Sequence, residues 1–316
     1  MRDESQEQLK KPRVATYFSS RSGETNRNTN VFMFVEDVWP AVMPIRGESR
    51  LAPNFSVEIR GNPDHQARAI AILKSLCSRD GDSRSSFERL LCASVGDLAH
   101  KLAAAGRAVH EIIRDEENGE AYQLYGFTFH RLFRAFGRYI QMIPRADRRL
   151  WNKAYIIIPK QDIWDIAMPK KLGGYRGYRA MLRKLARFQR FSPSFFRKEL
   201  SEGEFPAYYD DQRYHRAMKF VTAQITARWG WDQRDNNLQN STEFYWFYKR
   251  LTLKWAQACL REHIVNELNQ LFQRLDIEAE IVVNGLPTAQ DILEIRQQMC
   301  EGKISFGDAY DKCSVA

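Results

Sequence analysis

The sequence lacks the patterns that mark membrane and secreted proteins. It has no run of about 18 apolar residues, so we expect no membrane-spanning helix. Its N-terminus, MRDESQEQLKK, is charged and lacks the apolar core of a signal peptide. These absences predict a protein that has no membrane partner.

Paired cysteine motifs are also missing. The chain has five cysteines, an odd number, and no CxxC. Wide spacing of this kind argues against a disulfide framework or a zinc site and fits the reducing cytoplasm. The cysteines are Cys77, Cys92, Cys259, Cys300 and Cys313.

Short catalytic and nucleotide-binding motifs are absent as well. The sequence contains no GxxxxGK[ST], GxGxxG, GxSxG or HExxH. His263 and Glu267 are four residues apart, beside Glu262, but no further ligand stands at metal-binding spacing, which favours an ordinary helix face. We therefore expect no cofactor, no metal and no enzymatic activity. A nucleic-acid enzyme of unrecognised family, assembled from distant residues, stays a third hypothesis.

Positive charge is what the sequence has in excess. Lys and Arg number 48 against 39 Asp and Glu, which gives a net charge of +9. Such a surplus concerns partners, chiefly polyanions, and says nothing of the fold, although many basic proteins are simply soluble and bind no nucleic acid. The 316 residues, 44% of them hydrophobic, suffice for one large core or two smaller ones.

The positive charge concentrates in residues 168–191, MPKKLGGYRGYRAMLRKLARFQRF, which contain no acid. Arg179, Arg183, Arg187 and Arg190 are spaced 4, 4 and 3, so a helix presents them as one stripe. Two interpretations remain open: a solvated face paired with acids elsewhere, or a face for phosphate oxygens. The apolar residues that would pack inward are Met181, Leu182, Leu185 and Phe188.

A second basic stretch, HRLFRAFGRYIQMIPRADRRLW at 130–151, carries six Arg and one Asp. Its aromatic side chains either stack on bases or belong to the core or a subunit interface. These aromatic residues are Phe133, Phe136, Tyr139 and Trp151. The stretch matches no RNA-binding, zinc-finger or helix-turn-helix signature.

Periodicity predicts an α+β fold in which helix dominates. Residues 1–30 are polar and predict a flexible arm. Between Val31 and Arg60 the short apolar runs VFMFV and FSVEI, with three prolines, predict strands and loops. Between Asp64 and Arg114, RAIAILKSL and FERLLCASVGDLAHKLAAAG predict helices. VHEIIRD and AYQLYGF then flank Asn118-Gly119, a hairpin signal.

The second half of the chain combines strands with a long helix. AFGRYIQMIP and AYIIIPKQDIWDIAMP predict strands, and AEIVV predicts another. Helices are expected at 177–189, at 211–229 and, with Asn240 and Glu243 as a capping pair, at 242–275. Thr288 should cap a helix that ends near Gly302, and Ser305 with Asp308 should begin a last one.

The order of these segments, over roughly 85–310, resembles the portal proteins of tailed bacteriophages. That family has a phrase of the type Ile-Pro-x-x-x-Ile-x-x-Ile-x-x-Pro, which stands here from Ile158 to Pro169, before a Gly-rich turn and a helix. Its long helix ends with a pattern found here as Glu262, Leu268, Asn269 and Leu271. The chain departs from the family in its short length, its abbreviated 191–229 region and its missing acidic tail.

The resemblance implies a subunit of a ring, typically a dodecamer, through which double-stranded DNA is packaged and ejected. Partners would be terminase, capsid and head-completion proteins, and the location would be the virion after assembly in the host cytoplasm. The expected regions are an arm at 1–30, a wing-like region at 31–118, a clip- or stem-like region at 119–198 and a helical region at 199–316. The alternative is a nucleic-acid-binding module of a mobile element or defence system that forms no ring.

Two sets of basic residues are the candidate site on either hypothesis. The residues expected to contact DNA or the neighbouring ring subunit are Lys170, Lys171, Arg176, Arg179, Arg183, Lys184, Arg187 and Arg190. Those expected to dock a partner protein are Arg145, Arg148 and Arg149.

Overall fold

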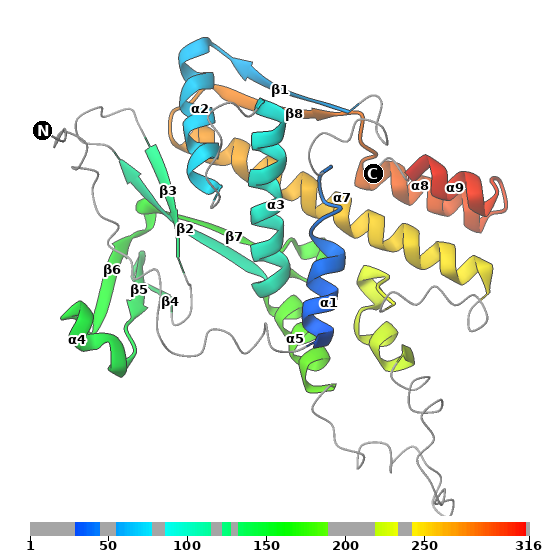
Figure 1. The fold of residues 1–316 in the computed structure, drawn as a ribbon, viewed down its shortest axis with the longest axis horizontal. Helices are drawn as coiled ribbons and strands as arrows, with labels where there is room; N and C mark the ends of the chain where they lie inside the picture. Colours follow the sequence, from blue (N-terminus) through cyan, green and yellow to red (C-terminus); the bar gives the residue numbers. More distant parts are fainter. Residues whose placement is uncertain are drawn as a thin grey trace, which may run out of the picture.

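The computed structural model describes residues 29–44, 55–77, 86–114, 122–127, 132–188, 219–232 and 242–313. It combines helices with three small sheets, which confirms the expected helix-dominant α+β class (Figure 1). The helices are α1 (Thr29–Val38), α2 (Pro63–Leu76), α3 (Phe87–Ala105), α4 (Arg148–Trp151), α5 (Gly174–Phe188), α7 (Glu243–Arg274), α8 (Ala289–Cys300) and α9 (Phe306–Cys313). Short 3₁₀ turns are η3 (Arg145–Asp147), η4 (Lys160–Asp162), η5 (Lys170–Leu172) and η7 (Ala227–Trp229).

All strand pairings in the described residues are antiparallel. The first sheet joins β1 (Ser56–Gly61) to β8 (Ala279–Asn284). The second has the order β3-β2-β7, from β2 (Arg107–Arg114), β3 (Tyr122–Gly126) and β7 (Ile163–Ala167). The third has the order β4-β5-β6, from β4 (Leu132–Ala135), β5 (Arg138–Met142) and β6 (Tyr155–Pro159).

Two hydrophobic clusters hold these elements together. The larger one gathers side chains from α1, α2, α3, α5, α7, α8 and α9 around the first two sheets. The smaller one lies under the third sheet and includes Tyr139, Ile156 and Ile158 with Val109 of β2 and Ile163 of β7. The third sheet is thus attached through a small core of its own, at one end of the molecule (Figure 1).

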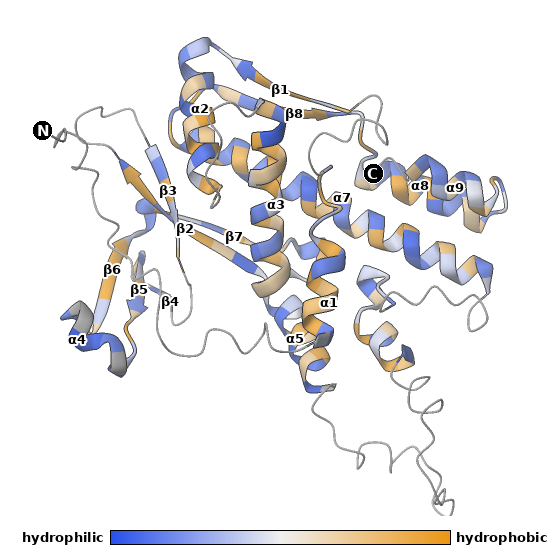
Figure 2. Cartoon of the chain, viewed as in Figure 1, coloured by the Kyte–Doolittle hydropathy of each residue, from blue (hydrophilic) through white to orange (hydrophobic). Residues whose placement is uncertain are grey.

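The segment VFMFV corrects one sequence-based expectation, because it is part of helix α1 and not a strand. Val31, Phe34, Val35 and Val38 lie on one buried face, whereas Phe32 is 52% exposed. These spacings of three and four residues are those of a helix, and a five-residue apolar run does not by itself distinguish the two structures. Figure 2 shows how strongly apolar residues predominate in α1.

The remaining expectations for helices and strands are largely confirmed. FSVEI, the hairpin strands β2 and β3, the strands β5 to β8 and the helices α5, α7, α8 and α9 all form. Thr288 and Asp291 make a capping box, and the Asp308 amide donates to Ser305 Oγ at 3.1 Å. The cap of α7 is Thr242, whose hydroxyl accepts from the Tyr245 amide, and not Asn240. Residues 1–28, Asn118-Gly119, 211–218 and Asn240 lie outside the described residues.

Candidate nucleic-acid interface

Helix α5 is fixed to the fold by the buried side chain of Tyr178. Its hydroxyl donates to the Ala103 carbonyl of α3 at 2.6 Å. Its ring lies 6.4 Å from that of Phe34 in α1 and 5.4 Å from that of Trp229 in η7. Burial raises the pKa of this phenol, so it remains a hydrogen-bond donor. Leu182 and Leu185 are buried on the same side, as the sequence predicts.

The opposite face of α5 carries exposed cations. Arg176, Arg183 and Arg187 are spaced 7 and 4, so they share one face of the helix, with Lys184 at its edge. All four are exposed. Within the described residues, none of them has an ion-pair or side-chain hydrogen-bond partner. We call these four residues the α5 basic face.

Arg179 does not belong to this face, although the sequence places it in the stripe. One of its guanidinium NH₂ groups donates to the Tyr175 hydroxyl at 2.9 Å, and its guanidinium carbon lies 5.6 Å from the centre of that ring. Arg107 approaches the same ring, at 5.8 Å. Arg179 therefore helps to attach α5 to β2, and the stripe is centred on Arg176, Arg183 and Arg187 instead.

The two lysines before α5 are exposed, on η5. Burial raises the pKa of Cys259 on α7 to about 11, and the positive charge of Lys171 opposes this shift. Lys171 therefore lies near α7. Lys170 and Lys171 thus extend the positive charge around the N-terminus of α5. Arg190 and the side chain of Phe188 lie outside what the structure describes.

The charges in and before α5 repel one another. The helix has no acid in its first turn, and two lysines precede it, where the helix dipole favours negative charge. Arg183 and Arg187 are a like-charged pair four residues apart, which costs a few tenths of a kcal/mol when unpaired. A polyanion placed along this face would relieve each of these repulsions.

The three arginines expected to dock a partner lie elsewhere. Arg145 is on η3, and Arg148 and Arg149 are on α4, beyond the end of β5. Arg145 and Arg149 are exposed, whereas Arg148 is half-buried and its Nε donates to the Ile143 carbonyl at 3.3 Å. Figure 1 places α4 well away from α5, so the structure separates the two basic regions.

The aromatic residues of the second basic stretch divide into two kinds. Phe133 is 57% exposed and Phe136, at the β4–β5 turn, is 100% exposed. Tyr139 is buried, and its hydroxyl donates to Asp165 at 2.9 Å, so it is not available to stack on a base. The side chain of Trp151 lies outside the described residues.

Phe133 belongs to an apolar surface on the third sheet. The register aligns Phe133 with Ile140 and Ile140 with Ile157, and it aligns Met142 with Tyr155. Because side chains alternate along strands, these five residues share the face opposite the small core. Tyr155 is 53% and Ile157 is 43% exposed. We call this surface the apolar sheet face.

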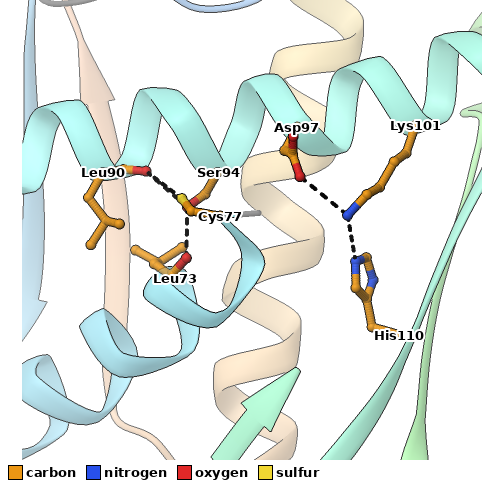
Figure 3. Close-up of polar contacts among 7 residues, drawn as sticks. All are labelled: Leu73, Cys77, Leu90, Ser94, Asp97, Lys101 and His110. Atoms are coloured by element: carbon orange, nitrogen blue, oxygen red, sulfur yellow. Dashed lines mark hydrogen bonds and ion pairs between the residues drawn. The ribbon is translucent and has the colours of Figure 1, made fainter. Parts of the chain in front are cut away.

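Two polar clusters inside the molecule are structural. Arg107 donates two hydrogen bonds to Asp165, at 2.6 and 2.5 Å, and with Tyr139 this pair joins the second sheet to the third. His110 is buried, and its Nε2 lies 3.4 Å from Lys101 Nζ, which also pairs with Asp97 at 3.4 Å (Figure 3). Burial, followed by the charge of Lys101, lowers the pKa of His110 to about 3.

Figure 3 also shows how Cys77 and Ser94 meet between α2 and α3. The Ser94 hydroxyl lies 3.0 Å from the Leu73 carbonyl and 2.9 Å from that of Leu90, and Cys77 Sγ is 3.3 Å from Ser94 Oγ. Burial raises the pKa of the Cys77 thiol. A protonated thiol beside a hydroxyl engaged with backbone carbonyls is a packing contact and no activated nucleophile.

The described residues give no sign of a metal centre. No group of three or more His, Cys, Asp or Glu residues gathers in the described ranges. His263 Nε2 lies 2.8 Å from the Ala167 carbonyl, so this side chain connects α7 to the end of β7. All five cysteines are free thiols. Among the described helices, none combines the length and apolar composition that a membrane span requires.

Comparison of the chain with protein-family models found no match, and comparison with curated proteins found none. The function of the protein is therefore inferred from its own residues. The basic helix was located from the sequence, whereas the contact of Arg179 with Tyr175 was not. The apolar sheet face was not predicted from the sequence. In FRAFGRYIQM and YIIIP, apolar residues occupy both of the alternating sets of strand positions, and this pattern indicates strands with two apolar faces.

Proposed function

We propose that this protein is a subunit of a portal-like ring that contacts double-stranded DNA through the α5 basic face. The observation that carries this proposal is the alignment of Arg176, Arg183 and Arg187 on one exposed helix face with no acid paired to them in the described residues. Contacts of arginine to phosphate oxygens bind DNA of any sequence, which is what a conduit requires.

The way α5 is anchored supports this proposal. A helix that presents charge to DNA must be held from its opposite side, and Tyr178, Leu182 and Leu185 do this. The apolar contacts offset the repulsion along the basic face, so α5 is stable before DNA arrives. A one-sided distribution of polar residues is usual in a surface helix, and what sets α5 apart is that it contains basic residues and no acid.

Exposed apolar groups at two opposite ends of the molecule support the ring. A closed ring of identical subunits uses heterologous contacts, in which one surface meets a different surface of the next subunit. The apolar sheet face lies at one end of the long axis. Toward the other end lies the start of α7, which carries Tyr245 (58% exposed), and the segment 219–225, which carries Phe220 (64% exposed), lies between it and α1. We propose that these two regions meet in the assembly, which would function in a virion.

Duplex DNA binding at several salt concentrations tests the role of the α5 basic face. The double variant Arg183→Glu, Arg187→Glu should bind DNA at least about tenfold more weakly. Because each lost phosphate contact lowers the salt slope by about 0.9, the slope should fall by about two units. Filter binding or fluorescence anisotropy measures both quantities.

The matched control is Arg60→Glu with Lys74→Glu, which changes the net charge equally. Both residues are exposed, and they lie near β1 and α2, away from α5 (Figure 1). The control should keep nearly the affinity and salt slope of the unaltered protein. Equal losses in the two double variants would show that only net charge matters, and the α5 basic face would then have no specific role.

A further inference from the structure

A small cavity lies between α7, α8, α9 and the turn that follows α1. Its volume is about 30 Å³, enough for one or two water molecules, and it is partly open to solvent. Its lining includes Val42 and Pro44 after α1, Leu286 and Pro287 before α8, and Cys313 of α9. These lining residues are apolar, but polar atoms make up more than half of the surface of the cavity.

Two cations of α7 line the same cavity, Lys254 and Arg261. They are seven residues apart, so two turns of the helix bring them onto one face. Arg261 is only 9% exposed, and one of its NH₂ groups donates to the Pro287 carbonyl. The Lys254 ammonium lies 5.4 Å from the centre of the Tyr310 ring. Gln257 lies between them in the sequence, and its side-chain amide nitrogen donates to the carbonyls of Asp37 and Val38, at 3.2 Å each.

Neither cation has a charged partner in the described part of the chain. Two acids of this region, Glu262 and Asp291, are engaged with backbone amides at the start of α8. Glu262 accepts from the Ala289 amide at 2.6 Å, and Asp291 accepts from the Thr288 amide at 2.8 Å. Glu262 still attracts Arg261 through space, but it forms no ion pair with it. Among the described residues, these two largely buried cations thus have no paired counter-ion.

The groups around Lys254 and Arg261 do not compensate these two positive charges. Burial raises the pKa of the Cys313 thiol to about 11, so this thiol is neutral and supplies no negative charge. Burial lowers the pKa of Lys254, and the positive charge of Arg250 contributes to the same shift. Burial also lowers the pKa of Arg261. Burial therefore disfavours both positive charges.

We propose that this cavity binds an oxyanion group, from phosphate or from a carboxylate, between Lys254 and Arg261. The anion supplies the counter-charge that the protein lacks at this position. Its oxygens accept hydrogen bonds from the ammonium and the guanidinium, and both donors are partly desolvated, which strengthens such bonds. The rest of the anion faces the open side of the cavity. This site is on α7 and is independent of the α5 basic face.

Thermal unfolding at fixed ionic strength tests the proposal with inorganic phosphate, acetate and chloride as the anions. Phosphate or acetate should raise the Tm of the protein above its value in chloride, and the more effective of the two identifies the geometry of the group. Isothermal titration calorimetry with the same anion should give a saturable signal. An equal Tm in all three anions, without a calorimetric signal, would overturn the proposal.

The variant Lys254→Met separates binding from the general effect of anions on stability. It removes one partly buried charge and keeps an unbranched chain against Tyr310, so it should raise the Tm in chloride. It should also weaken anion binding at least about tenfold and remove the anion-dependent rise in Tm. Lys254→Gln serves as a second variant with a polar end.

Lys249→Met is the matched control, because Lys249 is also on α7 but does not line the cavity. It should keep the anion-dependent rise in Tm. If Lys254→Met keeps this rise as fully as Lys249→Met does, the anion binds elsewhere and the cavity is no oxyanion site.

Discussion

At the scale of single residues, His110 is a buried group whose ionisation affects stability. It is 1% exposed, packs 5.4 Å from the ring of Trp164 and faces the Lys101 ammonium. Its pKa in the folded protein is about 3, against an ordinary value of 6.5. The unfolded chain therefore binds more protons than the folded one between these two values. Stability is fully present above pH 6.5 and falls as the pH decreases toward 3.

We predict that the protein loses on the order of 2 kcal/mol of stability through His110 between pH 7.5 and pH 5. His110→Gln removes the titrating ring and keeps an acceptor for Lys101, so its stability should depend less on pH by that amount. Urea unfolding at the two pH values measures the difference. Equal pH dependence in His110→Gln and the unaltered protein would contradict the buried, neutral state of His110.

At the scale of elements, Gly230 sets how closely η7 approaches α7. A Cβ at this position would lie 2.3 Å from the Lys249 carbonyl oxygen, and the backbone φ is +66°. Gly302 has a similar φ of +70°, but a Cβ added there would meet no atom within 4 Å. The two glycines thus share a backbone conformation and differ in the space around them.

We predict that Gly302→Ala costs about 1 kcal/mol, the strain of a left-handed backbone in alanine. Gly230→Ala should cost at least about 2 kcal/mol more, because η7 must also move away from α7. Chemical denaturation of the two variants gives the comparison. Similar losses of stability in the two variants would mean that η7 can move away from α7 at little cost. That result would contradict the prediction for Gly230→Ala.

The elements themselves were largely predictable from local sequence, and their pairings were not. Helical periodicity located α3 and α7, and Thr288 marked the start of α8 because capping depends on three neighbouring residues. The run VFMFV misled because its burial on one side is decided by α3, α5 and Trp229. The pairing of β2 with β7 joins residues more than 50 positions apart, such as Arg107 and Ala167, and no local pattern specifies it.

The candidate site shows the same division. The basic composition of α5 is visible in the sequence, and so is the spacing of its arginines. The contact of Arg179 with Tyr175 is not visible in the sequence. It depends on how Tyr175 of α5 and Arg107 of β2 meet in the folded chain. The cavity beside Lys254 and Arg261 was missed for the same reason. Only the folded chain shows that both cations line one cavity and that neither is paired with an acid in the described residues.

At the scale of the whole molecule, the proposed ring predicts a particle many times heavier than the 37.0 kDa chain. Native mass spectrometry with negative-stain images should show a closed ring with a central hole. The double variant Phe133→Asp, Tyr155→Asp should yield folded smaller species, because both side chains are exposed on the third sheet and its core is untouched. Phe32→Asp, at an exposed aromatic residue outside both apolar ends, should still form the ring.

A protein that stays monomeric at every concentration would contradict the ring. Salt-sensitive DNA binding by that monomer would then favour the nucleic-acid-binding module, in which the α5 basic face has the same role without assembly. Loss of the ring in Phe32→Asp as well would show that the two apolar ends are not the specific contact. These outcomes separate the two hypotheses, since only one of them requires an assembly.

The pairing of β1 with β8 has a consequence for the order of events during synthesis. Ser56 pairs with Asn284 and Gly61 with Ala279, so the sheet closes a loop of more than 200 residues. On the ribosome, β1 emerges long before its partner strand exists. Until residues 279–284 leave the exit tunnel, β1 presents an open strand edge, the kind of surface that pairs with other chains. The nascent protein is thus most prone to aggregation during this interval, and chaperone binding is most valuable there.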